Sequence, residues 1–551
     1  MSGSAQSWIS SIQDQGQFGD CWTFASAAAM DSNLLQQRIL PPAATPPSPV
    51  VSSWALSTAN GAPESLIGPG YGHGTGGWGG WEFQAMAYVT RGQGTWAIPG
   101  TVSSSMTTVS QMGGGPLAIT GTSSSLAFPA VLTNGPLPAN IGYLVPPTGQ
   151  VPAFGTRRVA LLDQGAPGNV ALPAATGTVS IAGTAYATYL FDQGAADPQV
   201  QAVKQAIVAN GAVTTSMNVV YDYFFQTGTT APYTNFYVNQ STATGNTDHE
   251  VTIIGWDDQL VVPAPGGGVT GTGAWLVQNS WGTGFWCNTA SGTSDGTFWA
   301  SYNDAAIGRS GVASFTMRAA LPDSLPVLQN EVGPLSTAYS QYAAPTLPTG
   351  MAPLASGTID GSGFVPSGTV ASVLTAPQDC TLSAIGVASQ MAGATVSANL
   401  YSQWLNGAPG GTLLASIADV PLAVGYAEVP LSAPLVLSAN QLLVVELIYS
   451  DVAAVPVVVG PDVINFTNTG STSVRAGLSY SMATSGTWLD LATLKFKNES
   501  IAGATADGGI LFAKGVVAVP EPTTLGGCAI GLATLVWLFR RGRRADERLI
   551  I

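Results

Sequence analysis

Glycine and proline interrupt this chain so often that helices can form in only a few stretches of it. Of its 551 residues, 67 are glycine and 37 are proline. Inside a helix, glycine costs about 1 kcal/mol and proline about 3 kcal/mol relative to alanine. Because 46% of the residues are hydrophobic, the chain is nevertheless too apolar to be disordered. The sequence therefore predicts a folded protein made largely of short strands and turns.

Three stretches keep the residues of a helix. Two of them, residues 22–39 and 82–92, are rich in strong helix formers. The third covers residues 197–210 and has apolar residues at helical spacing. Asp197 is its candidate N-terminal cap, and Gly211 is expected to end it.

Apolar runs of strand length fill much of the remaining chain. Four of them, at 212–219, 249–258, 273–281 and 297–304, are expected to be strands. Residues 100–195 show only loops and short strands. A chain of 551 residues exceeds what one hydrophobic core supports, so several domains are expected.

A domain boundary is expected near residues 320–327, and the pattern after it is entirely β. From 325 to 515, short apolar runs alternate with Gly, Pro and Asn, which predicts a sandwich or jelly roll. Residues 516–551 form a separate tail with an apolar stretch at 525–539 and a basic cluster behind it. Fifteen apolar residues are short for a membrane helix, but the arginines indicate a stop-transfer signal. The alternative is a buried helix of the β domain.

Charge and cysteine content exclude several classes of function. The net charge is −14, and five of the 16 basic residues lie in the last dozen positions, so nucleic acid is not an expected partner. The four cysteines are far apart and form no CxxC pair, so neither a metal site nor a dense disulfide scaffold is predicted. A single bridge between Cys287 and Cys380 stays open. Only His73 and His249 can supply an imidazole.

Cys21 is a candidate nucleophile. It lies where the glycine-containing segment QGQFGD meets the first predicted helix, and the helix dipole there favours a negatively charged sulfur. Attack on a carbonyl also needs hydrogen-bond donors for the oxyanion. The backbone N–H of Cys21 and the side-chain amide of Gln15 are candidates for these donors.

The base and its orienting group must come from distant segments. His249 opens one apolar strand between two acidic residues, Asp248 and Glu250, and Asn279 lies at the end of another. If these strands are neighbours, the Asn279 amide can accept a hydrogen bond from the imidazole. Trp281 is expected to cover that bond and exclude water. This arrangement is the Cys-His-Asn form of a catalytic triad.

These segments resemble those of papain-like (C1 family) cysteine peptidases, in the order in which that family has them. The matching segments are QDQGQFGDCWTF around Cys21, DHEVTIIGW around His249 and WLVQNSWGTGFW around Asn279, together with GGWGGWEFQAM at 76–86. The resemblance covers about residues 10–310. It implies an α+β peptidase with a helical half and a β-barrel half, within residues 1–320, and insertions at about 100–195.

The resemblance also implies roles for individual residues. Gln15 and Cys21 form the oxyanion hole, and Cys21, His249 and Asn279 form the catalytic triad of a thiol endopeptidase acting through an acyl-enzyme. The substrate-binding positions are Gly79 and Gly80, which pair with substrate backbone, Trp81 at the S2 pocket, and Asp248 and Trp281 beside the histidine. Polypeptides are the expected substrates, with no cofactor.

Two further resemblances concern the C-terminal half. Residues 325–515 resemble, in position and strand style, the lectin-like domain that follows some papain-like peptidases, which implies possible surface or matrix glycan partners. Pro520-Glu521-Pro522, the helix at 525–539 and the arginines resemble the PEP-CTERM sorting signal of Gram-negative bacteria, which an exosortase reads. That signal implies export to the cell surface or the medium. Residues 1–20, however, contain no signal peptide pattern.

A second hypothesis belongs to another class of protein. The chain could be a surface adhesin or carbohydrate-binding protein whose peptidase fold is inactive. The simultaneous presence of Gln15, Cys21, His249 and Asn279 favours the enzyme, because an inactive scaffold has no physical need for all four. Labelling by an epoxide thiol inhibitor distinguishes the two.

Overall fold

The structure is a computed structural model of the full chain. The residues that it describes are 8–15, 21–40, 49–51, 53, 56, 82–90, 109–110, 117–119, 131–132, 154–162, 177–181, 184–188, 194–219, 224–227, 234–237, 239, 247–263, 269–282, 296–319, 327–328, 351–353, 357–358, 365–459, 477–493, 495–497, 505–507 and 509–517. The predicted tail helix at 525–539 and the Pro-Glu-Pro motif lie outside these residues. Among the described helices, none has the length and apolar character needed to cross a membrane.

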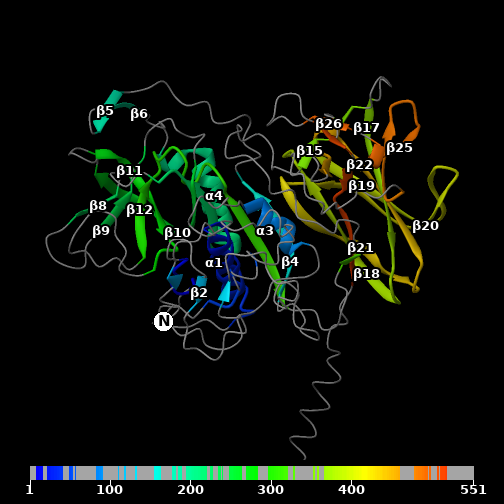
Figure 1. The fold of residues 1–551 in the computed structure, drawn as a ribbon, viewed down its shortest axis with the longest axis horizontal. Coiled ribbons are helices and arrows are strands. Elements are labelled where there is room, and N and C mark those ends of the chain that lie inside the picture. The colour runs from blue at the N-terminus through cyan, green and yellow to red at the C-terminus, as the bar shows by residue number, and fades with distance from the viewer. Residues whose placement is uncertain are drawn as a thin grey trace, which may run out of the picture.

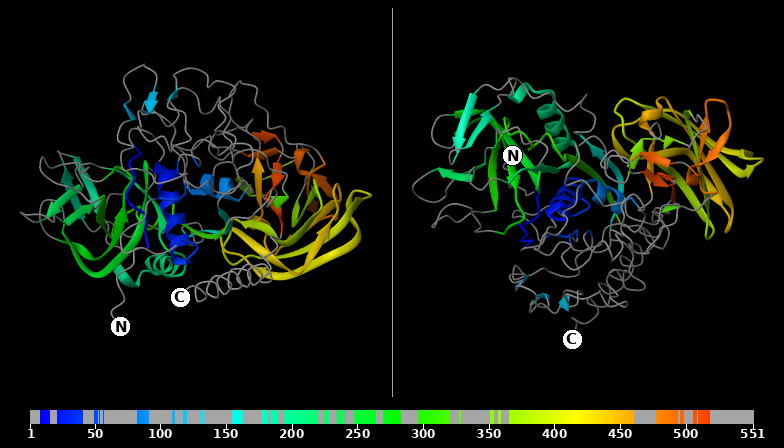
Figure 2. Two further views of the ribbon diagram at one scale, coloured as in Figure 1. Left: turned by 90° about the horizontal axis from the view of Figure 1, so that it is seen from below. Right: turned by 45° about the horizontal axis from the view of Figure 1, so that its top comes forward.

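The first predicted helix forms as α1, Cys21–Gln36, and it lies at the centre of the N-terminal half (Figures 1 and 2). Of its 16 residues, 15 are buried, so neighbouring elements enclose it on all sides. Its many small side chains let these neighbours approach closely. Polar residues tie it in place: the Asn33 side chain donates to the backbone of Asn210 at 2.7 Å and accepts from Met317 N–H at 2.7 Å.

A six-stranded sheet lies beside α1 in the order β7-β10-β11-β12-β9-β8. Its strands are β7 (Val213–Met217), β8 (Phe224–Thr227), β9 (Thr234–Tyr237), β10 (His249–Pro263), β11 (Val269–Gln278) and β12 (Thr297–Ser301). Buried Ile253, Val277 and Phe298 form part of its core. The four strands predicted between residues 212 and 304 are confirmed, although β10 continues to Pro263 and β11 ends before Asn279.

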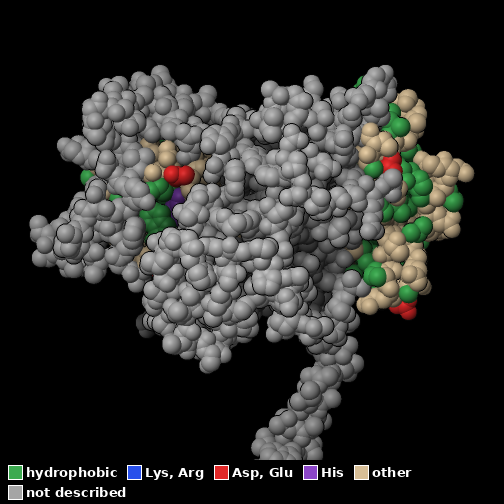
Figure 3. Space-filling model, in the orientation of Figure 1, with side chains coloured by type: hydrophobic (Ala, Val, Ile, Leu, Met, Phe, Trp, Pro, Cys, Tyr) green, Lys and Arg blue, Asp and Glu red, His purple; other side chains and the backbone are tan. Residues whose placement is uncertain are grey.

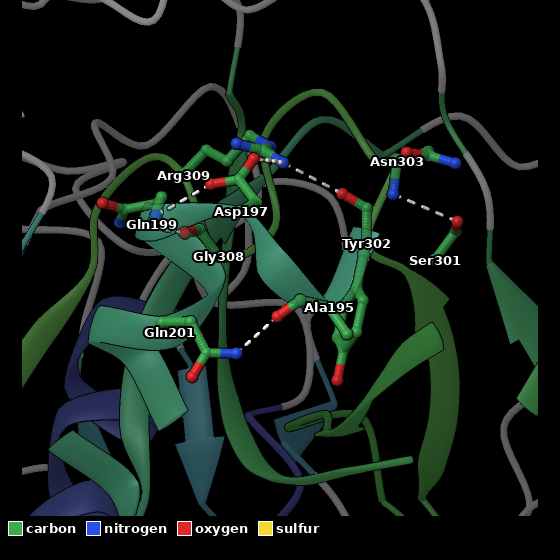
Figure 4. A network of polar contacts seen from close by, with 9 residues as sticks. All are labelled: Ala195, Asp197, Gln199, Gln201, Ser301, Tyr302, Asn303, Gly308 and Arg309. Atoms are coloured by element: carbon green, nitrogen blue, oxygen red, sulfur yellow. Dashed lines mark hydrogen bonds and ion pairs between the residues drawn. The ribbon is translucent and has the colours of Figure 1, made fainter. Parts of the chain in front are cut away.

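The helix predicted at 197–210 is α4, Pro198–Asn210, and its predicted ends are confirmed. The Asp197 side chain accepts from Gln199 N–H at 2.8 Å and also pairs with Arg309 at 2.8 Å, which ties the helix start to the segment after β12 (Figure 4). Gly211 ends the helix at φ 88°, and a Cβ there would lie 2.7 Å from the Ser32 hydroxyl. Only glycine fits this approach of α4 to α1. Another α-helix of this half is α3, Glu82–Val89.

A second six-stranded sheet crosses the predicted domain boundary, in the order β13-β4-β21-β18-β29-β14. The strands from the N-terminal half are β4 (Phe154–Leu161) and β13 (Ala313–Ala319), and those from the C-terminal half are β14 (Val327–Leu328), β18 (Cys380–Ser389), β21 (Gly425–Leu437) and β29 (Ala513–Val517). The two halves therefore share one hydrogen-bonded sheet. Strand β4 lies within residues 100–195, where the sequence had indicated only short strands and loops.

The junction between the halves depends on close contacts of β4 with β21. Gly425 has φ 112°, and a Cβ there would lie 2.1 Å from the Val159 carbonyl, so glycine is needed for the strands to pair. A largely buried ion pair at 3.0 Å joins Arg318 of β13 to Glu428 of β21. These contacts make the junction a continuous part of the fold.

The C-terminal half is a sandwich of two sheets, as predicted. The second sheet has the order β20-β19-β22-β17-β24-β25. Its strands are β17 (Pro366–Thr375), β19 (Thr395–Leu405), β20 (Ala408–Pro421), β22 (Leu442–Tyr449), β24 (Ser479–Ala483) and β25 (Trp488–Asp490). Buried side chains from both sheets, such as Val370, Ile385 and Val445, meet in one core.

Short strands complete the described structure. They are β1 (Val109–Ser110), β2 (Leu117–Ile119), β3 (Val131–Leu132), β5 (Gly177–Ile181), β6 (Thr184–Thr188), β15 (Met351–Pro353), β16 (Gly357–Thr358), β23 (Pro456–Val459), β26 (Lys495–Lys497), β27 (Thr505–Asp507) and β28 (Gly509–Leu511). Cys380 forms no disulfide, and Cys287 lies outside the described residues.

Candidate active site

Cys21 is the first residue of α1, the position that the sequence predicts for a nucleophile. It is buried, with 7% of its surface exposed. The first turn of a helix carries unpaired backbone N–H groups and the positive end of the helix dipole. A negative charge on the sulfur is therefore stabilised by the helix that positions it.

His249 and Asn279 meet through the pairing of β10 with β11. His249 begins β10 and Asn279 follows the last residue of β11, and the antiparallel register joins Thr252 to Gln278. Both side chains are buried. His249 Nε2 lies 2.8 Å from Asn279 Oδ1. The strands are neighbours, as the proposed triad requires.

The hydrogen bonds around Asn279 fix which imidazole nitrogen carries the proton. The Ser280 N–H donates to Asn279 Oδ1 at 2.8 Å, which identifies this atom as the carbonyl oxygen of the amide. An oxygen accepts only, so Nε2 of neutral His249 is the protonated nitrogen. Its Nδ1 is then the basic nitrogen, which is the tautomer that a general base for a thiol needs.

Trp281 covers the imidazole. Its ring stacks on that of His249 with centroids 4.5 Å apart and planes 22° apart. Phe224 lies against the tryptophan at 6.2 Å. The expectation that Trp281 shields the His249–Asn279 bond agrees with this geometry, whereas a contact with substrate is a separate prediction.

The N-terminal segment brings Gln15 to the same place. Gln15 N–H donates to the Ser280 carbonyl at 2.8 Å, Asp14 forms an antiparallel bridge with Trp281, and Gly282 N–H donates to Gln13 at 3.0 Å. The Ser280 hydroxyl donates to the side-chain oxygen of Gln15. This bond orients the amide so that its NH₂ end points away from Ser280, as an oxyanion donor requires.

The packing of α1 on β10 joins the cysteine to this group. Thr252, three residues after His249, donates its hydroxyl to the backbone carbonyl of Ala25 at 3.2 Å. Ala25 is one helical turn beyond Cys21. A small pocket between the two elements is lined by residues of α1, β10 and the Asn279 segment. The first turn of α1 and the start of β10 are therefore direct neighbours.

Burial controls the charge of His249. Removal from water lowers the pKa of its imidazole to about 4, and the hydrogen bond to Asn279 opposes this effect. Without a nearby negative charge, the buried imidazole of His249 is therefore neutral at physiological pH. An imidazolium at this position needs a neighbouring negative charge, and a thiolate at Cys21, the first residue of α1, is the candidate for it.

The other predicted site residues have different outcomes. Asp248 lies on the surface and accepts from Val219 N–H at 2.7 Å. Gly79, Gly80 and Trp81 lie outside the described residues. In the part of the chain that the structure describes, no group of three His, Cys, Asp or Glu side chains is placed to hold a metal ion.

Sequence reasoning missed the part played by Ser280. This buried residue bonds to both Gln15 and Asn279, so it links the candidate oxyanion donor to the candidate orienting amide. Its position next to Asn279 in the QNSW segment was the available signal.

Comparisons with known proteins agree with this geometry. A model of the papain family cysteine proteases matches residues 179–292, and a model of the lectin like domain matches residues 355–503. No curated protein matches the sequence.

Two solved structures resemble nearly the whole chain. One is a cysteine-to-alanine variant of the clostridial cysteine protease Cwp84 after propeptide cleavage, with 16% identity, a TM-score of 0.54, and coverage of 93% of this chain and 97% of that one. The other contains the cysteine protease and lectin-like domains of Cwp84, a surface layer associated protein of Clostridium difficile. It has 17% identity, a TM-score of 0.51, and coverage of 93% of this chain and 86% of that one. The fold is thus a papain-like peptidase fold followed by a lectin-like all-β domain.

Proposed function

We propose that this protein is a thiol endopeptidase that hydrolyses peptide bonds through an acyl-enzyme on Cys21. The single observation that carries this proposal is the 2.8 Å bond from His249 Nε2 to Asn279 Oδ1, beside a helix that begins at a cysteine. It holds the imidazole in the tautomer that can take a thiol proton.

The reaction divides into two steps. In the first, Nδ1 of His249 takes the proton of Cys21, the sulfur attacks the substrate carbonyl carbon, and the imidazolium gives its proton to the leaving amine. The tetrahedral oxyanion receives hydrogen bonds from the Cys21 N–H and the Gln15 amide. In the second step, His249 takes a proton from water, the hydroxide attacks the thioester, and the sulfur leaves.

The substrate is expected to lie along the groove between the two halves of the peptidase fold. We expect Gly79 and Gly80 to pair with its backbone, Trp81 to border the S2 pocket, and Asp248 and Trp281 to lie beside the scissile bond. These assignments come from the family resemblance.

We also propose that the enzyme is exported and held at a surface. The PEP-CTERM-like tail, with its helix at 525–539, is expected to be read and cut by an exosortase-type enzyme in a Gram-negative-type bacterium. The lectin-like domain is expected to contact glycans of the cell surface or matrix. Detection of the mature chain in the outer membrane or medium, shortened after residue 522, tests this part.

Active-site labelling tests the peptidase proposal. Incubation with the epoxide inhibitor E-64, followed by intact mass measurement, should add one inhibitor molecule to the wild type and none to Cys21→Ala. His249→Ala should slow labelling by about 100-fold to 10,000-fold, the usual contribution of a general base.

Cys380→Ala is the matched control, because Cys380 is a reduced thiol in the β domain. The Cys380→Ala variant should be labelled by E-64 to the same extent as the wild type. Wild-type protein that resists labelling between pH 6 and 8 would instead favour the inactive adhesin.

A further inference from the structure

One sheet of the C-terminal sandwich carries aromatic side chains on the face that points away from the core. The inward residues of β17, β19 and β22, such as Val370, Leu400 and Val445, lie in the core between the sheets. Side chains alternate along a strand, so the intervening residues lie on the outer face. There Tyr401, Trp404, Tyr480 and Trp488, the aromatic patch, pack against Ala371, Val373 and Val444 while each keeps part of its surface exposed. The pairing of β19 with β20 shifts between Tyr401 and Gln403, which breaks the alternation before Trp404.

The aromatic patch has a defined arrangement. The rings of Trp404 and Tyr480 are stacked, with centroids 3.9 Å apart and planes 18° apart, and Trp488 meets Trp404 edge-on at 5.6 Å. Trp404 lies on β19 and Tyr480 on β24, and two strands separate them. Because the buried residues between them are small, namely Ala371, Val373 and Val444, the rings can lie across the sheet. Hydrophobic side chains gather among uncharged polar ones on this side of the molecule (Figure 3).

A carboxylate lies in the same surface row as the aromatic rings. Cross-strand pairing aligns Asn399, Glu446, Ala371 and Tyr480 side by side. Asn399 donates to Glu446 at 2.8 Å, and the Tyr401 hydroxyl also bonds to this carboxylate. A carboxylate has about four acceptor positions, so Glu446 can accept further hydrogen bonds. Two strand spacings, about 9.6 Å, separate Glu446 from Tyr480, which suits a disaccharide.

The charge of this sheet restricts the ligand. Residues 365–459 and 477–493, which supply all six of its strands, contain no lysine or arginine. Glu446 and Asp490 contribute negative charge to the outer face. An acidic polysaccharide or a nucleic acid would find no counter-charge here, whereas a neutral sugar can donate its hydroxyls to the carboxylates.

We propose that the aromatic patch and Glu446 bind a neutral saccharide chain of β-1,4-linked glucose or N-acetylglucosamine. In these sugars the ring substituents are equatorial, so each ring face presents C–H bonds that can pack against the surface of Trp404 and Tyr480 that their mutual stacking leaves exposed. Ligand sites of this kind combine apolar and aromatic walls with a few polar groups that fix orientation. The patch lies within the region that matches the lectin like domain, and the inference does not depend on Cys21 or on peptidase activity.

Titration calorimetry of the full chain with cellohexaose and with chitohexaose tests the proposal. The wild type should bind at least one of the two. Trp404→Ala should lower the association constant at least tenfold, and Glu446→Gln should lower it several-fold. Trp404→Phe, which keeps a stacking ring, should retain most of the affinity, and the loss expected for Glu446→Gln keeps the test valid if Trp404→Ala is poorly folded.

Trp8→Ala is the matched control, because Trp8 is a tryptophan with 40% of its surface exposed in the other half of the chain. It should bind like the wild type. The proposal would be overturned by a wild type that binds neither sugar, by equal affinity in Trp404→Ala, or by tighter binding of galacturonate oligomers. Labelling of Cys21 by E-64 should be the same in all these variants, so failure of sugar binding is distinguishable from failure of the peptidase proposal.

Discussion

The charge of His249 should depend on the sulfur of Cys21. Burial lowers the pKa of the imidazole from 6.5 to about 4. This difference corresponds to about 3 kcal/mol for charging the ring in place. A Cys21 thiolate about 4 Å from the ring would stabilise the imidazolium by about 4 kcal/mol at an effective dielectric constant of about 20. The two free energies are similar, so the pKa of the ring should lie near its ordinary value when the thiolate is present and well below it when the thiolate is absent.

The perturbation is Cys21→Ala, which removes the counter-charge and leaves the burial unchanged. We expect the imidazole of this variant to titrate at about pH 4 and that of the wild type at about pH 7, because the attraction offsets the effect of burial. Because the chain has only two histidines, nitrogen NMR of labelled imidazoles gives two titrating groups, and His73→Gln assigns them. The same variant should lose stability as the pH falls from 6.5 towards 4, since its unfolded state binds a proton there and its folded state does not.

Two results would refute this reasoning. A midpoint near 6.5 in Cys21→Ala would mean that His249 is solvated and is not enclosed by Trp281 and Asn279. Equal midpoints in the variant and the wild type would mean that the sulfur and the imidazole do not interact, and the catalytic pair would be lost with them.

Three further predictions concern the site and the fold. Gln15→Ala should lower kcat by about 100-fold to 1,000-fold with little change in KM, because the amide acts on the oxyanion, and steady-state kinetics on a peptide substrate measures both. Asp31 accepts the backbone N–H groups of residues 50–51, and burial raises the pKa of its carboxyl to about 7. Between pH 3.8 and 7 the Asp31 carboxyl therefore holds a proton in the folded protein that it releases in the unfolded protein. The free energy of unfolding should fall as the pH rises through this range, and the stabilising contribution of Asp31 is lost above pH 7. Asp31→Asn should gain stability relative to wild type by up to about 4 kcal/mol between pH 4 and 8, measured by urea unfolding; no change with pH would show that Asp31 is ionised throughout. Gly425→Ala should destabilise the shared sheet by about 3 kcal/mol or more, because its Cβ would lie 2.1 Å from the Val159 carbonyl, and a thermal unfolding midpoint equal to that of wild type would contradict the role given to this contact.

Local sequence determined the helices and the choice of candidate reacting groups. The ends of α4 follow from Asp197 and Gly211, because a cap and a glycine at positive φ act within one helical turn. Cys21, His249 and Asn279 could be selected because few residue types can serve as nucleophile, base and orienting amide, and the chain offers only two imidazoles.

Tertiary structure decided which distant segments became neighbours. Residues 100–195 gave no sign that β4 would join β13 to β21, since the choice of a strand's partner depends on contacts far away in the chain. The hydrogen bond from Ser280 to Gln15 and the stacking of Trp404 on Tyr480 also depend on contacts between residues far apart in the chain. A sequence specifies chemistry residue by residue, whereas the packing of sheets and loops specifies which of those residues share a site.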